Sequence, residues 1–343
     1  MRTPQFIRFG SRRIGVEEHA LVVAEIGINH EGDVQTCARM VEEAVKAGAD
    51  AIKLQTIAPD RNYAPDTESH RLFSTATLTR EETDRIFSLS RSHDIEAFTT
   101  VGDLATLEWV NQLKPTGYKV SSGLLTCTPL IQRLARTGRP LLMSTGMANH
   151  TDIDAAVNAA SAADAEEIVL FHCTSIYPCP VEKLNLAAIP WLRERYGLEI
   201  GFSDHALGSN TAALAIAAGA TAIEKHFSLD PSRAGYDHGT SLNPDEFRLM
   251  VVGIREAEAA RGGPGKKTDS ELLAIRDKNS RYLAVVTHVS AGELLDENNV
   301  GFIRLHDVSE ALPASGFERV CGMRAVKDLP PFTALTESSI GDG

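Results

Sequence analysis

From residue 20 onward, short apolar runs alternate with longer stretches in which apolar residues recur every three or four positions. Within the short runs most residues are apolar at consecutive positions, and many are β-branched. This pattern is typical of parallel strands that are covered on both faces. It predicts eight strands: LVVAEI (21–26), AIKLQ (51–55), IEAFTT (95–100), YKVSS (118–122), PLLMST (140–145), EIVLFHC (167–173), EIGFSD (199–204) and AIEKHF (222–227).

The stretches between the runs predict helices. The clearest example, residues 36–47, carries a stripe formed by Met40, Val41, Ala44 and Val45 and is followed by Gly48, a suitable helix end. The other predicted helices are 104–113, 129–136, 153–162, 186–196, 210–218 and 244–260. Eight strand-then-helix units predict a (β/α)8 TIM barrel. The competing fold is an open, doubly wound sheet, but no GxGxxG turn follows any of the strands.

The alternation ends near residue 262. The glycine-rich, charged segment RGGPGKKTDSELL (261–273) has the composition of a linker. Beyond it, RYLAVVTHVSAGELL alternates apolar and polar residues and predicts a hairpin that turns at Ala291–Gly292. We therefore predict a barrel domain over 1–262, a linker over 263–279 and a small, mostly β domain over 280–343.

Composition narrows the class of protein. A chain of 343 residues with 43% hydrophobic and 23% charged residues is typical of a globular protein with more than one domain. The net charge of -12 argues against a nucleic-acid partner. The five cysteines form no CxxC pair, which argues against a disulfide framework and favours the reducing cytoplasm. No apolar run is long enough for a membrane span, so we expect no membrane partner.

Polar residues gather where the predicted strands end. Catalytic side chains of such barrels lie at these carboxyl ends. Lys53 and Lys119 stand inside apolar strands, with serines and threonines close by in the sequence. Each lysine alone could be a solvated surface charge. Two lysines and several hydroxyls entering one barrel from different strands instead indicate a site for a phosphate and a carboxylate.

Two histidines stand at the ends of adjacent strands, His205 in SDH and His226 in EKH. Each by itself could be a hydrogen-bonded core histidine. Their placement at neighbouring strand ends favours a pair of metal ligands. Two imidazoles with the remaining coordination positions open describe a catalytic metal site rather than a closed structural one.

At these residues the sequence resembles the sialic acid synthase family, which also includes legionaminate and pseudaminate synthases. The resemblance rests on AEIGINHEGD (24–33), KLQT (53–56), KVSSG (119–123), LMSTGMA (142–148), HCTSIYPCP (172–180), GFSDH (201–205), AIEKHFSLD (222–230) and DHGTSLNPDEF (237–247). The tail from residue 280 is similar to that family's C-terminal antifreeze-like (SAF) domain. The resemblance therefore covers nearly the whole chain.

The resemblance implies an enzyme that condenses phosphoenolpyruvate with a sugar aldehyde by C–O cleavage. It implies a divalent ion on His205 and His226, manganese first, with magnesium and cobalt as alternatives. Glu25 would position or deprotonate a water near the metal. Phosphoenolpyruvate would be held by Lys53, Thr100, Lys119, Ser122, Ser144, Ser203 and Ser175, the last at a position that is usually asparagine. The acceptor would meet Gln55, Tyr177 and Asp237.

Three positions depart from the family pattern. Leu124 stands where a glutamate usually contacts the sugar acceptor, and Thr100–Val101–Gly102 replaces Thr-Pro-Phe. In the tail, Arg304 keeps the cation of an Arg-Pro-Gly segment but is followed by Leu305. The resemblance implies a domain-swapped homodimer in which Arg304 reaches the partner's site. The half that binds phosphoenolpyruvate and metal keeps its residues, whereas the acceptor half is altered.

Other functions stay open at this point. An unusual sugar or a nucleoside aldehyde could replace the usual acceptor, since leucine at 124 cannot accept a hydrogen bond. A metal-dependent pyruvate aldolase is a more distant alternative, and phosphate release distinguishes it from a synthase. A non-catalytic carbohydrate-binding protein is the alternative outside enzymes. Intact Glu25, Lys53, Lys119, His205 and His226 argue against it.

Overall fold

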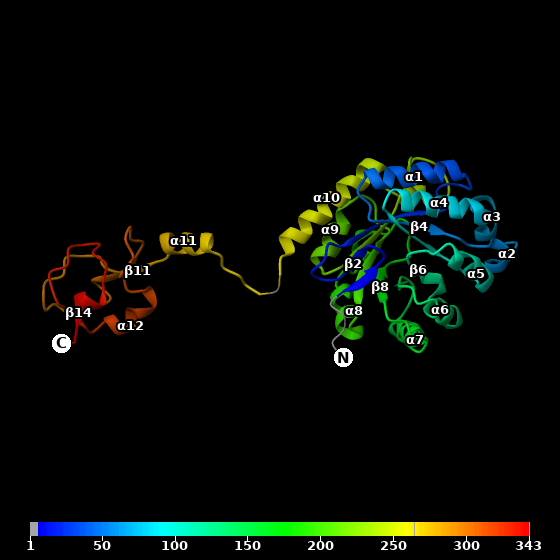
Figure 1. Cartoon of the computed structure of the whole chain (residues 1–343). Helices are drawn as coiled ribbons and strands as arrows, with labels where there is room; N and C mark the ends of the chain where they lie inside the picture. The colour runs from blue at the N-terminus through cyan, green and yellow to red at the C-terminus, as the bar shows by residue number, and fades with distance from the viewer. Residues whose placement is uncertain (1–5, 264, 343) are drawn as a thin grey trace. The chain divides into compact units, whose positions relative to one another are not determined.

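The computed structural model describes residues 6–263 and 265–342. Residues 1–5 and 343, at the outer ends of the two predicted domains, and residue 264 of the predicted linker lie outside the described residues. The chain divides into two compact units, Met1–Gly262 and Gly263–Gly343 (Figure 1). Each unit is described by itself.

The larger unit is a closed barrel of eight parallel strands in the order β10-β3-β4-β5-β6-β7-β8-β9. The predicted TIM barrel is therefore confirmed, and the open sheet is excluded. Each predicted strand is present with its ends shifted by two residues at most. The strands are β3 Leu21–Gly27, β4 Ala51–Gln55, β5 Glu96–Thr100, β6 Tyr118–Val120, β7 Leu141–Ser144, β8 Ile168–Cys173, β9 Glu199–Asp204 and β10 Ala222–His226.

Helices cover the outside of the barrel. They are α1 Val34–Lys46, α2 Pro59–Asn62, α3 Glu68–Ala76, α4 Arg80–Ser92, α5 Leu104–Gln112, α6 Thr128–Ala135, α7 His150–Ser161, α8 Ala188–Tyr196, α9 Asn210–Ala217 and α10 Pro244–Arg261. Short 3-10 turns add η1 Ser122–Leu124, η2 Val181–Lys183 and η3 His238–Thr240. The sequence pattern did not predict α2, α3 or α4. The buried face of α4 includes Thr83 and Ser90 beside Ile86 and Phe87, so its apolar stripe is weak.

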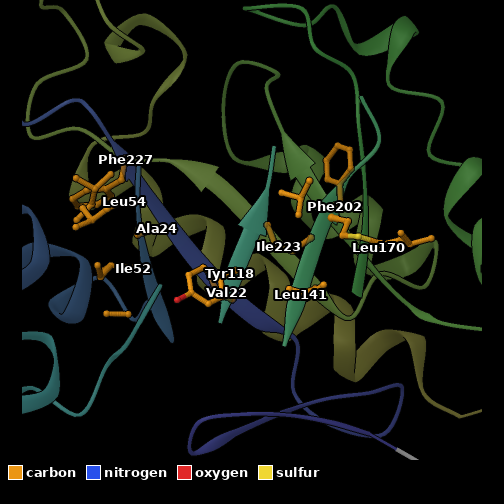
Figure 2. Close-up of a cluster of buried hydrophobic side chains, with 14 of the residues drawn as sticks. Val22, Ala24, Ile52, Leu54, Tyr118, Leu141, Leu170, Phe202, Ile223 and Phe227 are labelled. Carbon is orange, nitrogen blue, oxygen red and sulfur yellow. The ribbon is translucent and has the colours of Figure 1, made fainter. Parts of the chain in front are cut away.

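Successive residues of each barrel strand pack on opposite sides of the wall, as the two-residue period of a strand requires. One set, which includes Val22, Ala24 and Ile52, packs with apolar residues of the surrounding helices (Figure 2). The alternate set forms a separate inner cluster of Leu21, Val23, Ala51, Phe98, Leu142, Val169, Phe171 and Ala222. This inner cluster is the apolar floor of the barrel lumen, below the strand ends.

A hairpin that the sequence pattern did not predict completes this inner cluster. Its strands, β1 Ile7–Phe9 and β2 Arg12–Ile14, pair antiparallel and contribute Ile7, Phe9 and Ile14. Phe9 is fully buried and meets Phe98 edge to face, with ring centroids 5.2 Å apart. Burying a side chain of this size stabilises a fold by about 1.5–3 kcal/mol. The hairpin therefore packs on the amino-terminal side of the lumen and leaves the opposite end open.

The smaller unit contains the predicted small β region, preceded by a helix. It contains α11 Ser270–Asn279, β11 Tyr282–Val285, β12 Val300–Ile303, η4 Ala314–Gly316, α12 Phe317–Val320, β13 Arg324–Ala325, η5 Glu337–Ser339 and β14 Ile340–Gly341. Its core is a separate apolar cluster that includes Leu283, Val285, Leu295 and Leu335. None of the helices in the described residues is both long and apolar enough to span a membrane.

One local prediction in this unit was wrong. A turn does occur at Ala291–Gly292, but the residues on its two sides do not pair with each other. Instead Val289 forms an antiparallel β-bridge with Leu329, and Leu294 forms one with Arg324. Both partners come from the C-terminal part of the unit. The predicted linker contains the helix α11, whose first turn is capped by the side chain of Asp269 accepting from the Leu272 N–H. Capping of this kind stabilises a helix without a buried face.

Candidate active site

A cavity of about 600 Å³ opens at the carboxyl ends of the barrel strands. Fourteen of the fifteen residues predicted for the site line it: Glu25, Lys53, Gln55, Thr100, Lys119, Ser122, Leu124, Ser144, Ser175, Tyr177, Ser203, His205, His226 and Asp237. The fifteenth, Arg304, is an exposed residue that follows β12 in the smaller unit. The barrel alone therefore brings together every predicted residue that it contains.

Strand alternation explains how these residues reach one cavity. On β10, Ala222 belongs to the inner apolar cluster, and Glu224 and His226 follow at two-residue steps on the same side. On β7 the same step leads from Leu142 to Ser144, and on β4 from Ala51 to Lys53. Each of these three strands thus contributes an apolar residue deep in the lumen and a polar one nearer its carboxyl end.

Two buried lysines meet two buried carboxylates at the base of the cavity. Lys119 Nζ donates to Glu224 Oε2 at 2.6 Å, and Lys53 Nζ lies 3.2 Å from the same oxygen. Lys53 Nζ also lies 3.4 Å from Glu25 Oε2. Ser203 Oγ donates to the other oxygen of Glu224 at 2.9 Å. This group of four charges forms one network around Glu224, a residue that sequence reasoning noted at a strand end but did not assign to the site.

Burial and mutual charge set the protonation of this network. Burial opposes the ionisation of Glu224, but Lys119 and Lys53 outweigh it and lower the pKa of that carboxyl. Burial lowers the pKa of Lys119 to about 8, against the opposing effect of Glu224. Burial raises the pKa of Glu25, although Lys53 opposes the shift. A carboxyl whose pKa is raised toward neutrality is suited to exchanging a proton during a reaction.

The position of Glu25 depends on the end of β3. The pairing register between β3 and β4 shifts between Glu25 and Gly27, and Gly27 adopts φ +56°. A Cβ at Gly27 would lie 3.1 Å from Glu25 Oε1 and 3.2 Å from Gln55 Nε2. The backbone angle therefore favours glycine here, and a Cβ would push the Glu25 carboxylate or the Gln55 amide out of position by a few tenths of an ångström. Gln55 Nε2 donates to Glu25 Oε1 at 2.7 Å and so fixes the direction of the carboxylate.

Hydroxyl groups surround the lysines. Gly146 N–H donates to Ser122 Oγ at 3.0 Å, and a Cβ at Gly146 would lie within 2.5–2.9 Å of Ser175 Oγ, Cys173 Sγ and Ser122 Oγ. Glycine at 146 therefore allows these side chains to converge. Thr100 Oγ1 is buried without a hydrogen-bond partner. Hydroxyls beside buried cations form a site suited to a phosphate or carboxylate.

The two predicted metal ligands lie side by side, with ring centroids 5.6 Å apart. His205 Nδ1 lies 2.8 Å from the Thr174 carbonyl oxygen, which can only accept, so Nδ1 carries the hydrogen and Nε2 keeps its lone pair. Burial, reinforced by His226, lowers the pKa of His205 to about 3. His226 Nδ1 is buried without a hydrogen-bond partner and lies 3.6 Å from Asp237 Oδ2.

These features fit the predicted metal site. His205 presents a neutral imidazole whose Nε2 lone pair faces the Tyr177 hydroxyl at 3.1 Å, a contact that a bound ion would replace. The unpartnered His226 nitrogen is the kind of buried polar atom that a ligand would satisfy. Among the described residues, no group of three or more His, Cys, Asp or Glu side chains is arranged to hold a metal ion. The protein therefore offers two histidines, and water or substrate would complete the coordination of an ion there.

The outer part of the cavity contains residues that sequence reasoning missed. The segment between β4 and β5 contributes Ile57, Asn62, Tyr63, Ser69 and Phe73, and the loop after β7 contributes Met147. Tyr63 and Phe73 pack with their ring centroids 5.2 Å apart. A long insertion between the second and third predicted strands was the available signal, since enlarged loops on this end of a barrel often form binding surfaces.

The loop that carries Asp237 is anchored to the first strand end. Asp237 N–H donates to Asn29 Oδ1 at 3.0 Å, and Asn29 Nδ2 donates to the Phe227 carbonyl at 3.0 Å and to Ser241 Oγ at 2.9 Å. The buried Asn29 therefore joins the end of β3 to the segment after β10. His172 is buried, with its Nε2 2.7 Å from the Leu184 carbonyl oxygen, and it is not among the residues that line the cavity.

Comparisons with known proteins identify the family of this chain. Residues 40–266 match the NeuB family. The chain is 35% identical over 298 residues to an uncharacterised protein of Methanocaldococcus jannaschii, covering 87% of this chain and 88% of that protein. It is 30% identical over 344 residues to the N,N'-diacetyllegionaminic acid synthase of Legionella pneumophila, covering 95% and 96%.

A solved structure gives the same result. The N-acetylneuraminic acid (sialic acid) synthetase of Leptospira borgpetersenii serovar Hardjo-bovis, in complex with citrate, matches with a TM-score of 0.76 and 29% identity. The match covers 80% of this chain and 97% of that one. The family resemblance found in the motifs is thus confirmed. The chain belongs to the NeuB family and is an enzyme, a condensing transferase of the acid synthase type.

Proposed function

We propose that this enzyme condenses phosphoenolpyruvate with a sugar-like aldehyde and releases inorganic phosphate, giving a nonulosonate-like α-keto acid. One observation carries the proposal: two buried lysines converge at the base of the cavity. The Nζ atoms of Lys53 and Lys119 lie 3.2 Å and 2.6 Å from the same oxygen, Glu224 Oε2. Two cations this close, surrounded by hydroxyls, suit a small substrate with both a phosphate and a carboxylate.

The cluster would hold phosphoenolpyruvate with its reactive carbon toward the cavity mouth. Lys53, Lys119 and Ser203 would bind the anionic groups, with Thr100, Ser122, Ser144 and Ser175 as further donors. Both lysines are buried, so their interactions with a bound anion are screened little by water. Phe171 supports Lys119, whose Nζ lies 4.4 Å from the centroid of its ring.

The bonds change in a defined order in this proposal. C3 of phosphoenolpyruvate bonds to the aldehyde carbon, whose oxygen takes up a proton, and C2 becomes electron-deficient. A water adds to C2 and loses a proton, for which Glu25 is placed as the acceptor, with Gln55 orienting it. The C2–O bond to the phosphate then breaks, and the C2 hydroxyl gives its proton to the departing phosphate, leaving the keto group and free phosphate. The lysines offset the charge on the departing phosphate.

We propose that a divalent ion, manganese first, binds His205 and His226. When bound there it would supply Lewis-acid polarisation of the aldehyde oxygen. Thr174 contributes by holding the His205 ring through its carbonyl, which fixes the tautomer that offers Nε2. Tyr177 OH lies 3.1 Å from that nitrogen and Asp237 3.6 Å from His226, so both stand beside the place where the aldehyde would react.

The acceptor is proposed to differ from N-acetylmannosamine. Leu124, at the end of η1, lines the cavity with an apolar side chain, and Ile57, Phe73 and Met147 add further apolar surface. A hydroxyl or amide aimed at Leu124 finds no partner there, which disfavours a polar group at that point. This favours an acceptor with an apolar group on that side, such as an unusual sugar or a nucleoside aldehyde.

We also propose, on the family resemblance alone, a homodimer in which Arg304 acts at the partner's site. Mixing an Arg304→Ala chain with a Lys53→Ala chain should then restore activity that neither chain has by itself. An active enzyme that is strictly monomeric in solution contradicts this arrangement.

A phosphate-release screen tests the proposed function. Purified enzyme with manganese and phosphoenolpyruvate is offered a panel of aldehydes, among them N-acetylmannosamine, deoxygenated and N-acylated hexosamines, and nucleoside 5′-aldehydes. Phosphate should appear only when phosphoenolpyruvate and an aldehyde are both present. Carbon–carbon bond formation with pyruvate in place of phosphoenolpyruvate would contradict the proposal.

A further inference from the structure

Asn62 stands at the end of α2, in the segment between β4 and β5, and lines the outer part of the cavity. Its side-chain amide is held in place by the protein. Nδ2 donates to the Ala58 carbonyl at 2.8 Å and to Asp103 Oδ2 at 3.3 Å. Asp103 is itself fixed as the N-cap of α5, where it accepts from the backbone N–H groups of Ala105 and Thr106. Asn62 is therefore an oriented group rather than a free surface amide.

The side chain of Asn62 occupies the space above Gly102. A Cβ at residue 102 would lie 1.8 Å from Asn62 Oδ1 and 2.7 Å from its Cγ. Real side chains do not approach so closely, so any other residue at 102 would displace the amide. Gly102 does not have a positive φ angle. The requirement for glycine is thus one of space, and the three atoms nearest to that Cβ all belong to the Asn62 amide.

The hydrogen bonds leave one atom of the amide for a ligand. Both N–H donors of Nδ2 point to protein acceptors, the Ala58 carbonyl and Asp103. No donor in the described part of the chain bonds to Asn62 Oδ1. Because Asn62 lines the cavity and is partly exposed, a ligand can reach this oxygen. A carbonyl oxygen accepts only. The ligand group that matches it is a hydroxyl or an N–H.

We propose that Asn62 and Gly102 act together as a specificity determinant for the aldehyde acceptor: Gly102 leaves the space in which Asn62 Oδ1 accepts a hydrogen bond from an acceptor hydroxyl or N–H group. This inference rests on the proposed function and adds to it a donor group that the acceptor must carry. It concerns the outer part of the cavity, apart from the lysines.

Burial distinguishes the acceptor from phosphoenolpyruvate as the ligand of Asn62. Lys53 and Lys119 are 5% and 1% exposed, at the base of the cavity, and neither contacts Asn62. Asn62 stands instead beside Tyr63, on a helix outside the barrel strands. A small dianion held by the two lysines occupies the base, so a group at the mouth meets the other substrate.

A double-mutant cycle tests the proposal by binding, without turnover. The probes are phosphoenolpyruvate and a series of sugar alcohols that cannot react, namely the reduced forms of N-acetylmannosamine and of deoxygenated and N-acylated hexosamines. The alcohol that binds the unmodified enzyme most tightly is used with every variant. Asn62→Ala should weaken binding of the alcohol roughly fivefold, the value of one neutral hydrogen bond, and leave the phosphoenolpyruvate Kd within about twofold. Gly102→Ala should give the same loss by displacing the amide. The double variant should be no worse than either single variant, because both remove one interaction.

Gly123→Ala is the matched control, since Gly123 lines the same cavity and a Cβ there meets only Met147 Cε, at 3.8 Å. It should leave both Kd values unchanged. Losses that multiply in the double variant, a larger effect on phosphoenolpyruvate than on the alcohol, or no binding of any alcohol of the series to the unmodified enzyme would each overturn the inference. Failure of phosphoenolpyruvate to bind the unmodified enzyme would instead overturn the proposed function.

Discussion

The base and the mouth of the cavity are built in different ways. At the base, Lys53, Lys119 and Glu224 stand on barrel strands, are almost fully buried and bond to one another. At the mouth, Asn62 and Leu124 stand on short helical turns and are partly exposed. The residues at the base therefore constrain one another, because removing one of the charges would leave another charge buried without a partner. The mouth can change without that penalty, and the departures from the family pattern at Leu124 and Gly102 lie there.

The largest expected effect concerns the two histidines next to the base. Replacing His226 with Ala should abolish activity, and exhaustive chelation should abolish the activity of the unmodified enzyme. Added manganese should restore the activity of the chelated enzyme but not that of the variant. Metal affinity measured by calorimetry gives a readout independent of turnover. His150→Ala, an exposed residue at the start of α7, is the control and should retain activity. Full activity after chelation contradicts the metal site.

The next effect concerns the base itself. Lys119→Met keeps the length of the side chain but removes its charge, and it should lower kcat/KM for phosphoenolpyruvate by about 10³-fold, as loss of a preorganised charge does. The aldehyde KM should change little if the base and mouth bind separate substrates. Steady-state kinetics with each substrate varied in turn measures both. The control is Lys46→Met, on the exposed end of α1, which should have no effect. Equal losses for both substrates in Lys119→Met would contradict the distinction between base and mouth.

A pH profile makes the same distinction without a substitution. Lys119 has a pKa lowered to about 8, so it is a cation below that pH and becomes neutral above it. An anionic substrate loses its partner as the pH rises, so kcat/KM for phosphoenolpyruvate should fall above about pH 8, by about tenfold per unit at the limit. The profile for the aldehyde KM should stay flatter. A flat phosphoenolpyruvate profile up to pH 9.5 would contradict the assignment of Lys119.

The smallest effect is expected at the mouth. Unmodified enzyme should turn over N-acetylmannosamine poorly or not at all, and Leu124→Glu should raise kcat/KM for that sugar by at most about tenfold, part of the value of one charged hydrogen bond. Leu124→Gln is the matched variant without the charge. Turnover of N-acetylmannosamine by the unmodified enzyme at about 10⁴ M⁻¹s⁻¹ or better would show that Leu124 is neutral.

The sequence predicted the base far better than the mouth, for a physical reason. A strand repeats every two residues, so the spacing of Lys53 and Gln55, or of Ser203 and His205, already tells which side chains share a face. All eight strands, the two lysines and the two histidines could be found from this pattern. The resemblance to the synthase family, and not the strand period, supplied the remaining site residues, such as Tyr177 and Asp237. Glu224 was noted at a strand end but not assigned, because a lone glutamate two residues before a metal ligand gives no sign of the two lysines that it contacts.

The mouth depends on contacts between segments far apart in the sequence. The sequence around Asn62 does not show that its amide lies over Gly102, 40 positions later. Nor does it show that Phe73 lines the same cavity. The same limit explains the C-terminal unit, where the turn at Ala291–Gly292 was predicted correctly but the pairing of Val289 with Leu329 was not. Local patterns predict elements, whereas long-range packing selects their partners.

The most direct test of the central claim follows the oxygen that joins C2 of phosphoenolpyruvate to phosphorus. Phosphoenolpyruvate labelled with ¹⁸O at that bridging position is incubated with enzyme, manganese and an accepted aldehyde, and the phosphate is analysed by mass spectrometry. Water addition at C2 followed by C–O cleavage predicts that the label leaves entirely with the phosphate, one phosphate for each keto acid formed. Label retained in the keto acid, or keto acid formed without phosphate, would contradict the account.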